Sequence, residues 1–308
     1  MGDSQPPNLT IQRKKHMSNP AHTDCYEARM ADQQDTDGSQ HWYTRGANFV
    51  VAVTLARPGA DLVRQGSDQT DEYMVLLPED VRAVLNAGGE TVVSGGDALS
   101  IVPPGDSRVS LPDGGWVYRV FSKFAVDVLN SARNASDYAD GAPDVAALES
   151  WPEPVGGWRL RHYPLAEHVR SDTTMRLFRT CHLMINVFLP NKAPRDIRKM
   201  TPHSHADFEQ GSLAIRGHYI HHMRYPWTPD KTNWREDEHT EVGSPSLLVI
   251  PPKVIHTSQS IGESGMRLVD IFAPPRDDFS LRPGLVCNEA DYPLPERLKG
   301  ISAPSQLA

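Results

Sequence analysis

The fold is decided by the stretch HSHADFEQ, which occupies residues 203–210. Side chains alternate along an extended strand, so His203 and His205 point to the same face. A third histidine, His256, follows an apolar run that ends in two prolines. Two histidines at this spacing, a nearby carboxylate or amide and a distant third histidine form a plausible ligand set for a divalent metal.

Around this stretch, from Trp42 onwards, the chain consists of short apolar runs separated by Gly, Pro and Asp. That texture is typical of an all-β sandwich or barrel. It also repeats, because DEYMVLL (71–77) followed by GDALSIVPPG (96–105) resembles EQGSLAIRG (209–217) followed by GSPSLLVIPP (243–252). Repetition at this long period indicates a duplicated domain rather than a solenoid.

The second block resembles the cupin superfamily in both of its motifs. HSHADFEQ, closed by Gly217, is similar to the first motif, and the run from Gly243 to His256 is similar to the second. The resemblance covers roughly residues 42–275. It implies an all-β bicupin: two antiparallel cupin (jelly-roll) barrels in one chain, joined by short helical connections, with a metal centre in the second barrel only. Because cupins often pair through exposed strands, it also implies a homodimer.

Two residues compete for the remaining ligand position. Cupins commonly place a glutamate there, which indicates Glu209. Counting back from Gly217, however, Gln210 occupies the position that the family's strand points inward. We therefore predict that His203, His205, Gln210 and His256 are the metal ligands, with Glu209 as the alternative to Gln210. A neutral amide leaves the site more positive, which favours an anionic substrate.

The first block departs from the family at every histidine position. An alignment of Glu72 with Gln210 defines the counterparts. Gln65 and Ser67 then replace the first two histidines, and Arg108 replaces the third. We predict that the first barrel binds no metal, with Arg108 as a candidate anion ligand inside it.

Composition divides the chain into five segments. Residues 1–40 are polar and carry few large apolar groups, so we expect a flexible tail. Met17 and Met30 are candidates for an alternative start. The remaining segments are the degenerate first barrel, a helical and loop linker, the metal-binding second barrel and an irregular C-terminal tail: residues 41–125, 126–158, 159–275 and 276–308.

A strand expected over residues 176–189 supplies two further site candidates. Its alternate residues form one apolar face and one mixed face, and the mixed face carries His182 and Asn186. A ligand-holding barrel has such a mixed interior. Both residues are therefore candidates for substrate contact or for support of the metal ligands.

Residues after the HxH motif provide the other candidates. His222 is a candidate acid or base, because the pKa of histidine lies near neutrality. Arg216 and Arg224 are candidates for holding a substrate carboxylate through a bidentate fork. Trp227 lies in a charged loop over residues 226–241 that is long enough to form a lid.

Charge and composition exclude several classes of protein. The chain has 31 Lys and Arg against 39 Asp and Glu, a formal charge of −8, which argues against nucleic-acid or anionic-membrane partners. Its apolar runs are too short to span a bilayer, and its polar start lacks the apolar core of a secretory signal. Three widely spaced cysteines favour a reducing compartment, so we expect a cytoplasmic protein.

The resemblance implies a metalloenzyme that acts on a small polar or aromatic acid. The first expectation is a non-haem Fe(II) dioxygenase, similar to the bicupins that cleave gentisate and salicylate. Those enzymes usually coordinate through three histidines alone, so a fourth candidate ligand moves weight towards a non-oxidative lyase, isomerase or decarboxylase with Fe, Mn, Zn or Ni. A non-catalytic bicupin that binds a small molecule is the further alternative.

Overall fold

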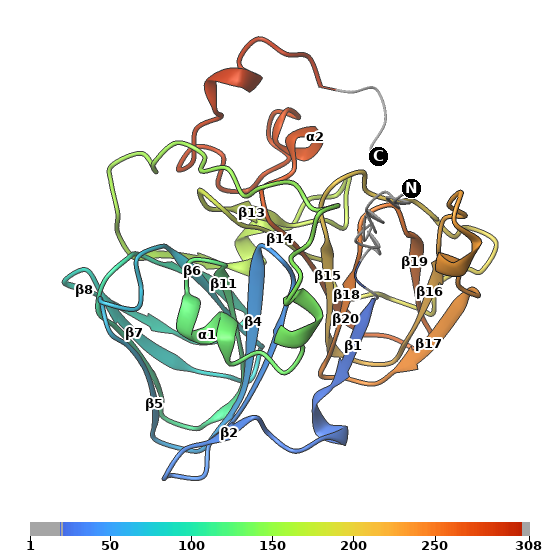
Figure 1. The fold of residues 1–308 in the computed structure, drawn as a ribbon. Helices are drawn as coiled ribbons and strands as arrows, with labels where there is room; N and C mark the ends of the chain where they lie inside the picture. The colour runs from blue at the N-terminus through green and yellow to red at the C-terminus, as the bar shows by residue number, and fades with distance from the viewer. Residues whose placement is uncertain (1–18, 20, 304–308) are drawn as a thin grey trace, which may run out of the picture.

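The computed structural model describes residues 19 and 21–303 (Figure 1). Its regular secondary structure consists of strands apart from two short helices, α1 (Val126–Asn130) and α2 (Asp277–Ser280), and five 3-10 turns in the described residues. The expected all-β class with short helical connections is confirmed. No helix in the described part of the chain is long and apolar enough to cross a membrane. The 3-10 turns are η1 (Tyr26–Ala28), η2 (Ala135–Tyr138), η3 (Leu165–His168), η4 (Lys231–Asn233) and η5 (Glu296–Leu298).

The first barrel is built from a seven-stranded and a four-stranded antiparallel sheet. In spatial order, the larger sheet holds β12 (Arg161–Pro164), β9 (Ala98–Val102), β6 (Tyr73–Leu77), β11 (Gly115–Ser122), β4 (Phe49–Ala56), β3 (Gln40–Arg45) and β2 (Gln33–Gln34). The smaller one holds β5 (Ala60–Arg64), β10 (Ser107–Leu111), β7 (Ala83–Ala87) and β8 (Glu90–Ser94).

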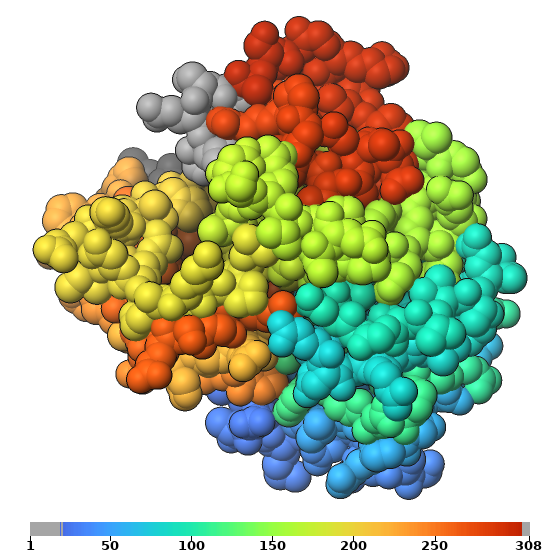
Figure 2. Space-filling model, turned by 180° about the vertical axis from the view of Figure 1, so that it is seen from behind, coloured from blue at the N-terminus to red at the C-terminus, as the bar shows by residue number. Residues whose placement is uncertain are grey.

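The second barrel repeats this plan with a six-stranded and a three-stranded sheet. The larger sheet holds β1 (His22–Cys25), β18 (Ser246–Ile250), β15 (Gln210–Arg216), β20 (Arg267–Phe272), β14 (Met184–Val187) and β13 (Leu177–Arg179). The smaller one holds β17 (Glu238–Val242), β16 (Tyr219–Arg224) and β19 (Ile255–Ser260). The two barrels lie side by side, and the C-terminal segment, red in both views, runs across one end of the molecule (Figure 1, Figure 2).

Each barrel takes its edge strand from the other part of the chain. β1 precedes the first barrel in sequence but pairs with β18 of the second. β12 lies in the segment assigned to the second barrel but pairs with β9 of the first. The structure therefore differs from the sequence boundaries: the expected tail contributes the strands β1 and β2, and apart from β1 the second barrel begins after residue 164. Residues 1–18 of the expected tail lie outside the described residues.

The strand expected over residues 176–189 is a hairpin. β13 pairs with β14, and residues 180–183 form the turn, closed by a hydrogen bond from the Thr180 amide to the Leu183 carbonyl. Because of this turn, residues before it point to the face opposite to the one that a continuous strand would give them. Phe178 therefore joins Ile185 in the core between the barrels.

Candidate metal centre

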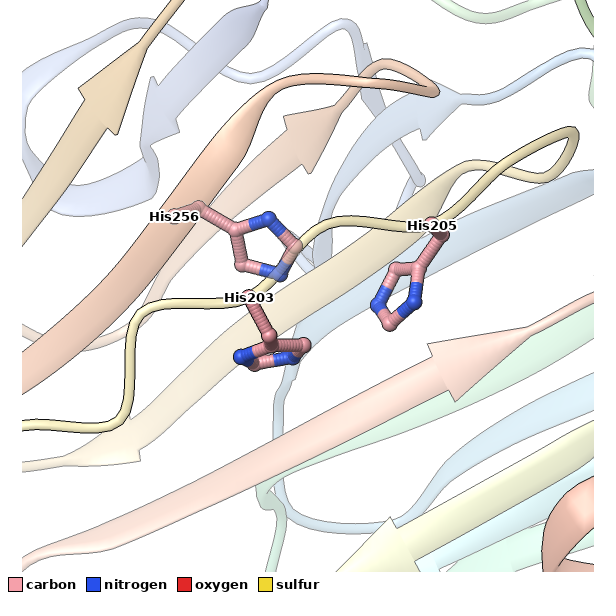
Figure 3. A group of neighbouring side chains, drawn as sticks. All are labelled: His203, His205 and His256. Atoms are coloured by element: carbon pink, nitrogen blue, oxygen red, sulfur yellow. The ribbon is translucent and has the colours of Figure 1, made fainter. Parts of the chain in front are cut away.

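Three histidines converge inside the second barrel, as Figure 3 shows. His256 lies on β19, and a backbone bridge holds His203 beside it. His205 is anchored through its carbonyl, which accepts a hydrogen bond from the Lys253 amide. A potential ligand atom from each of the three lies within 4.8 Å of the others. This spacing lets one ion contact all three side chains.

Backbone carbonyls orient two of these rings. Nδ1 of His203 lies 3.0 Å from the Thr201 carbonyl, and Nδ1 of His256 lies 2.9 Å from the Val254 carbonyl. Because a carbonyl only accepts, each Nδ1 carries the proton and donates it, which leaves Nε2 with a free lone pair. The tautomer that a metal requires is thus already present.

Burial keeps the histidines neutral. It lowers the pKa of His205 to about 3 and that of His256 to about 4, and it also lowers the pKa of His203. Neutral imidazole is the form that binds a metal, so protons do not compete at neutral pH.

The Gln210 side chain is directed to the place where the three histidine rings converge. Its Oε1 lies 2.9 Å from Nε2 of His205 and 3.3 Å from Nε2 of His256. Its Nε2 donates to the Ser212 hydroxyl at 3.0 Å and to the Asp270 carboxylate at 3.1 Å. These two acceptors fix the amide so that its oxygen faces the histidines. Three nitrogens and one oxygen are donor types that suit a divalent transition metal.

Glu209 points to the opposite side of β15. Its carboxylate accepts hydrogen bonds from the Ala47 amide at 2.6 Å and from the Tyr138 hydroxyl at 2.9 Å. Both donors come from segments outside the second barrel, and burial raises the pKa of Glu209. This carboxylate is therefore a contact between parts of the chain and is turned away from the histidine cluster.

Asp270 is a candidate functional residue that the sequence analysis did not identify. It lies on β20 next to Gln210 and Ser212, and burial raises the pKa of its carboxyl group to about 7, although hydrogen bonds from both neighbours favour the charged form. The side chain still reaches the cavity described below. Near neutral pH it can therefore both hold and release a proton. Its one sequence signal was a carboxylate with apolar residues on both sides, in the run LVDIF (268–272).

The histidine cluster opens onto a large cavity. The cavity has a volume of about 1110 Å³, and His203, Gln210, His256 and Asp270 contribute to its lining. Its remaining walls come from residues 169–174 and 188–195 and from β19 and β20. Such a volume admits an organic acid beside the cluster.

Three basic residues that the sequence analysis also missed line this cavity: Arg170, which pairs with Asp172, and Lys192 and Arg195. The Arg195 guanidinium donates to the Thr201 hydroxyl at 2.8 Å and to the Ser258 carbonyl at 3.3 Å. Neither Arg195 nor Lys192 forms an ion pair with a described carboxylate, so both are available to a bound anion. The signal was the basic run KAPRDIRK (192–199) directly before the HxH motif.

The structure places the arginine and tryptophan candidates away from the cavity. Arg216 lies 3.6 Å from Glu79 of the first barrel, and Arg224 forms an ion pair with Asp237. Trp227 is 77% exposed and stacks on Trp234 with a ring separation of 4.5 Å. The loop 226–241 therefore packs on itself, and none of these residues lines the cavity.

The histidine candidates are also placed differently from expectation. His222 points outward from β16 to His239, while the buried His221 points inward and bonds Ser258. His182 lies in the turn between β13 and β14 and contacts Asp71 and Ser150. Asn186, on β14, faces inward opposite Asp270, but its amide oxygen accepts from the Arg176 backbone.

The strand register shifts the sequence alignment of the two barrels, which matched Glu72 with Gln210, by one residue. Gln210 lies opposite Phe272, and Tyr73 lies opposite Phe121 at the same place in the first barrel. Tyr73 is thus the counterpart of Gln210, and Glu72 is the counterpart of Glu209.

The other ligand positions follow from the same register. His256 is bridged to His203, and in the first barrel Ser107 is paired with Arg64. The Tyr73 hydroxyl lies 3.0 Å from the Ser107 hydroxyl, where Gln210 approaches His256 in the second barrel. A guanidinium, a phenol and a serine make a poor ligand set for a divalent ion.

Arg108 is not inside the first barrel. It is half-exposed and forms an ion pair with Asp61 at 2.7 Å. The expected role of Arg108 as an interior anion ligand is therefore wrong, because this position on β10 faces outward.

The described strands form two antiparallel barrels, and their fold is the all-β cupin jelly roll. No family model matches the sequence, and a search of curated proteins finds no match. Solved structures do show the similarity in fold. Protein Ylba from E. coli has 9% identity and a TM-score of 0.55, over 84% of this chain and 92% of that chain. The Lactobacillus farciminis oxalate decarboxylase, in a formate complex, has 13% identity and a TM-score of 0.52 (82% and 86%). AerE from Microcystis aeruginosa has 8% identity and a TM-score of 0.51 (77% and 93%).

Proposed function

We propose that this protein is a metal-dependent cupin enzyme that acts on a small carboxylic acid in its second barrel. The observation that carries the proposal is the convergence of three histidines and the Gln210 amide oxygen beside a cavity of about 1110 Å³. A purely structural histidine cluster needs neither the orienting carbonyls nor a cavity of this size.

His203, His205, His256 and Gln210 would hold one divalent metal, with Fe(II) first and Mn, Zn or Ni as alternatives. Such an ion acts as a Lewis acid that polarises a substrate oxygen or, as Fe(II), supports oxygen chemistry. The four ligands are neutral, so the site keeps the full charge of the ion and favours an anionic substrate.

Residues of the cavity wall would bind and orient that substrate. Arg195 and Lys192 supply positive charge and hydrogen-bond donors for a carboxylate. The Asp270 carboxyl, beside Gln210, is placed to give a proton to the substrate or to take one from it. Residues 192–195 would therefore bind the substrate carboxylate, and Asp270 on β20 would transfer the proton.

Among reaction classes we place a non-oxidative lyase, isomerase or decarboxylase first. Four protein ligands leave fewer positions for a chelating substrate together with dioxygen than three do, and Asp270 supplies the proton that such reactions need. The oxalate decarboxylases among the structural neighbours support a carboxylate lyase. An Fe(II) dioxygenase is the second candidate, favoured by a ligand set in which no carboxylate takes part.

Metal analysis and oxygen uptake test the proposal. Wild-type protein purified without oxygen is compared with His203→Ala/His256→Ala, over a panel of keto, dicarboxylic and aromatic acids. We expect about one equivalent of metal in the wild type only, as in single-site cupins, with substrate turnover that consumes no oxygen. Substrate-dependent oxygen uptake by the iron form supports the dioxygenase instead. Equal metal content in both proteins after reconstitution, or ligand binding without turnover, contradicts the proposed enzyme.

A further inference from the structure

The first barrel contains a polar cavity of its own. It has a volume of about 250 Å³, and its lining includes His41, Tyr43, Arg64, Arg119 and Asp127. Since a water molecule in the liquid occupies about 30 Å³, the cavity can hold a molecule of a few carbon atoms. Asp127 belongs to α1, which packs against β3 and β4.

Arg119 is a buried charge in this cavity, and its protein contact there is the face of the Phe121 ring, 5.7 Å from the guanidinium carbon; no hydrogen bond or ion pair joins it to a described residue. Its side chain comes from β11 and is only 6% exposed. No described group accepts a hydrogen bond from its guanidinium, and its Nε is completely shielded from solvent. A guanidinium buried in this way is unfavourable unless something pairs with it.

Arg64 shows what a satisfied arginine looks like in the same cavity. Its guanidinium donates to both oxygens of Asp127, to the Gln69 amide oxygen and to the Asp68 carbonyl. Arg64 and Arg119 line the same cavity, but only the guanidinium of Arg64 has hydrogen-bond acceptors among the described residues. No carboxylate of the described residues forms an ion pair with Arg119.

Strand register explains why Arg119 faces the interior. It pairs with Val75 on β6, as Asp270 pairs with Ser212 on β15. Arg119 is thus the first-barrel counterpart of Asp270, the carboxyl that faces the cavity of the second barrel. The first barrel thus carries a positive side chain where the second carries an acidic one, and a positive side chain suits an anionic ligand.

Other acids around the cavity are already engaged. Asp127 pairs with Arg64, Asp61 with Arg108, and Asp35 lies 2.9 Å from Nε2 of His41. The Asp35 carboxylate also accepts a hydrogen bond from the Gln33 amide at 3.1 Å, and burial lowers the pKa of His41, so its ring adds no positive charge beside that carboxylate. The cavity thus offers one unpaired cation inside and one acidic group towards its edge.

We propose that the first barrel binds a small carboxylic acid, with the carboxylate on Arg119 and a hydroxyl or amino group directed to the Asp35 side. Such a hydroxy or amino acid supplies acceptors to the guanidinium and a donor to the acidic edge. This site is independent of the metal centre and does not rest on the proposed reaction.

Calorimetric titration of the full-length protein tests the proposal, with glycolate, glycine, acetate and inorganic phosphate as probes. The variants are Arg119→Met, the exposed and paired Arg82→Met as matched control, and His203→Ala/His256→Ala to remove the metal centre. We expect glycolate or glycine to bind the wild type, Arg82→Met and the histidine variant alike. Arg119→Met is expected to bind at least about tenfold more weakly, the size of one charge-assisted hydrogen bond.

Thermal unfolding without ligand gives a second readout. Arg119→Met is expected to melt at or above the wild-type temperature, because it removes a buried unpaired charge. Should that variant not fold, Arg119→Lys keeps the charge and loses the planar fork, and is expected to bind the same probes more weakly. Unchanged affinity in the Arg119 variants, binding that disappears with the histidines, binding of phosphate alone or no binding of any probe overturns the proposal.

Discussion

Two neighbouring residues at the start of β15, Glu209 just before it and Gln210 as its first residue, divide the chemistry of the second barrel. Gln210 faces the three histidines, while Glu209 faces the Ala47 amide and the Tyr138 hydroxyl. Adjacent residues in a strand point to opposite faces, so only one of the two can reach a metal held by the histidines. The carboxylate, a strong ligand by residue type, is placed where it holds two chain segments together.

Substitution by alanine separates these roles. Gln210→Ala is expected to lower metal affinity at least about tenfold, the scale found for residues that support a metal site, with little change in melting temperature. Glu209→Ala, the matched control, leaves a buried amide and hydroxyl without an acceptor and is expected to cost about 1–3 kcal/mol of stability while retaining the metal. Metal titration and urea unfolding measure the two effects. The reverse result, metal loss with Glu209→Ala only, contradicts this assignment.

Most of the histidine cluster could be predicted from sequence because its spacing is local, and the distant His256 was found through the run that ends in two prolines. His203 and His205 are two residues apart, and Gln210 follows from the alternation that ends at Gly217. Asp270 and Arg195 could not be found in this way. Asp270 meets Gln210 only through strand pairing, and Arg195 meets the cavity only because its segment folds back beside β19.

At the level of elements, the exchange of edge strands ties the two barrels together. β1 contributes four residue pairs to β18, and Tyr26, directly after it, is completely buried in the core between the barrels. The Tyr26 hydroxyl also donates to Thr44 of β3. A short N-terminal segment thus contacts both barrels.

Truncation tests how much this segment contributes to the stability of the fold. A chain that starts at Met30 lacks β1 and Tyr26, whereas a chain that starts at Met17 keeps both. We expect the Met30 chain to lose about 3–5 kcal/mol or more, the usual cost of removing a large buried aromatic side chain, and to melt well below the Met17 chain. Thermal unfolding followed by circular dichroism measures the difference. Equal melting temperatures of the two chains would show that β1 contributes little.

Periodicity identifies strands but not their partners. The apolar runs predicted a barrel from residue 42, yet the polar sequence HTDC of β1 carries no apolar alternation and is a strand only because the edge of β18 receives it. The hairpin over residues 177–187 was missed for a related reason. Its turn contains no glycine or proline, so the alternation appeared continuous through Thr180–Leu183.

Across the whole molecule, the hydrophobic residues that the structure describes form five clusters, and the largest lies between the two barrels. This cluster combines residues of both large sheets, among them Phe49 of β4 and Leu213 of β15. Arg267 of the second barrel adds ion pairs at 2.8 Å to Glu79 and to Asp97 of the first. Such a shared interior favours unfolding as one cooperative unit.

The C-terminal segment adds a pH-dependent contact to this unit. Tyr292, fully buried, donates to the Glu72 carboxyl at 2.6 Å, which connects the chain end to β6. Burial raises the pKa of Glu72 from 4.5 to about 7, although the bond from Tyr292 favours the charged form. Between these two values the native protein holds a proton that the unfolded chain releases. Stability from this group is therefore present below pH 4.5 and is lost as the pH rises to about 7.

Urea unfolding of Glu72→Gln and the wild type between pH 5 and pH 8 measures this term. The amide cannot ionise, so the variant is expected to gain up to about 3 kcal/mol relative to the wild type as the pH rises. Glu236→Gln, at an exposed position, serves as the matched control and is expected to keep a constant difference from the wild type. A difference between Glu72→Gln and the wild type that does not change with pH would mean that Glu72 is ionised in the folded protein throughout this range. The junction of the C-terminal segment with the first barrel would then not titrate.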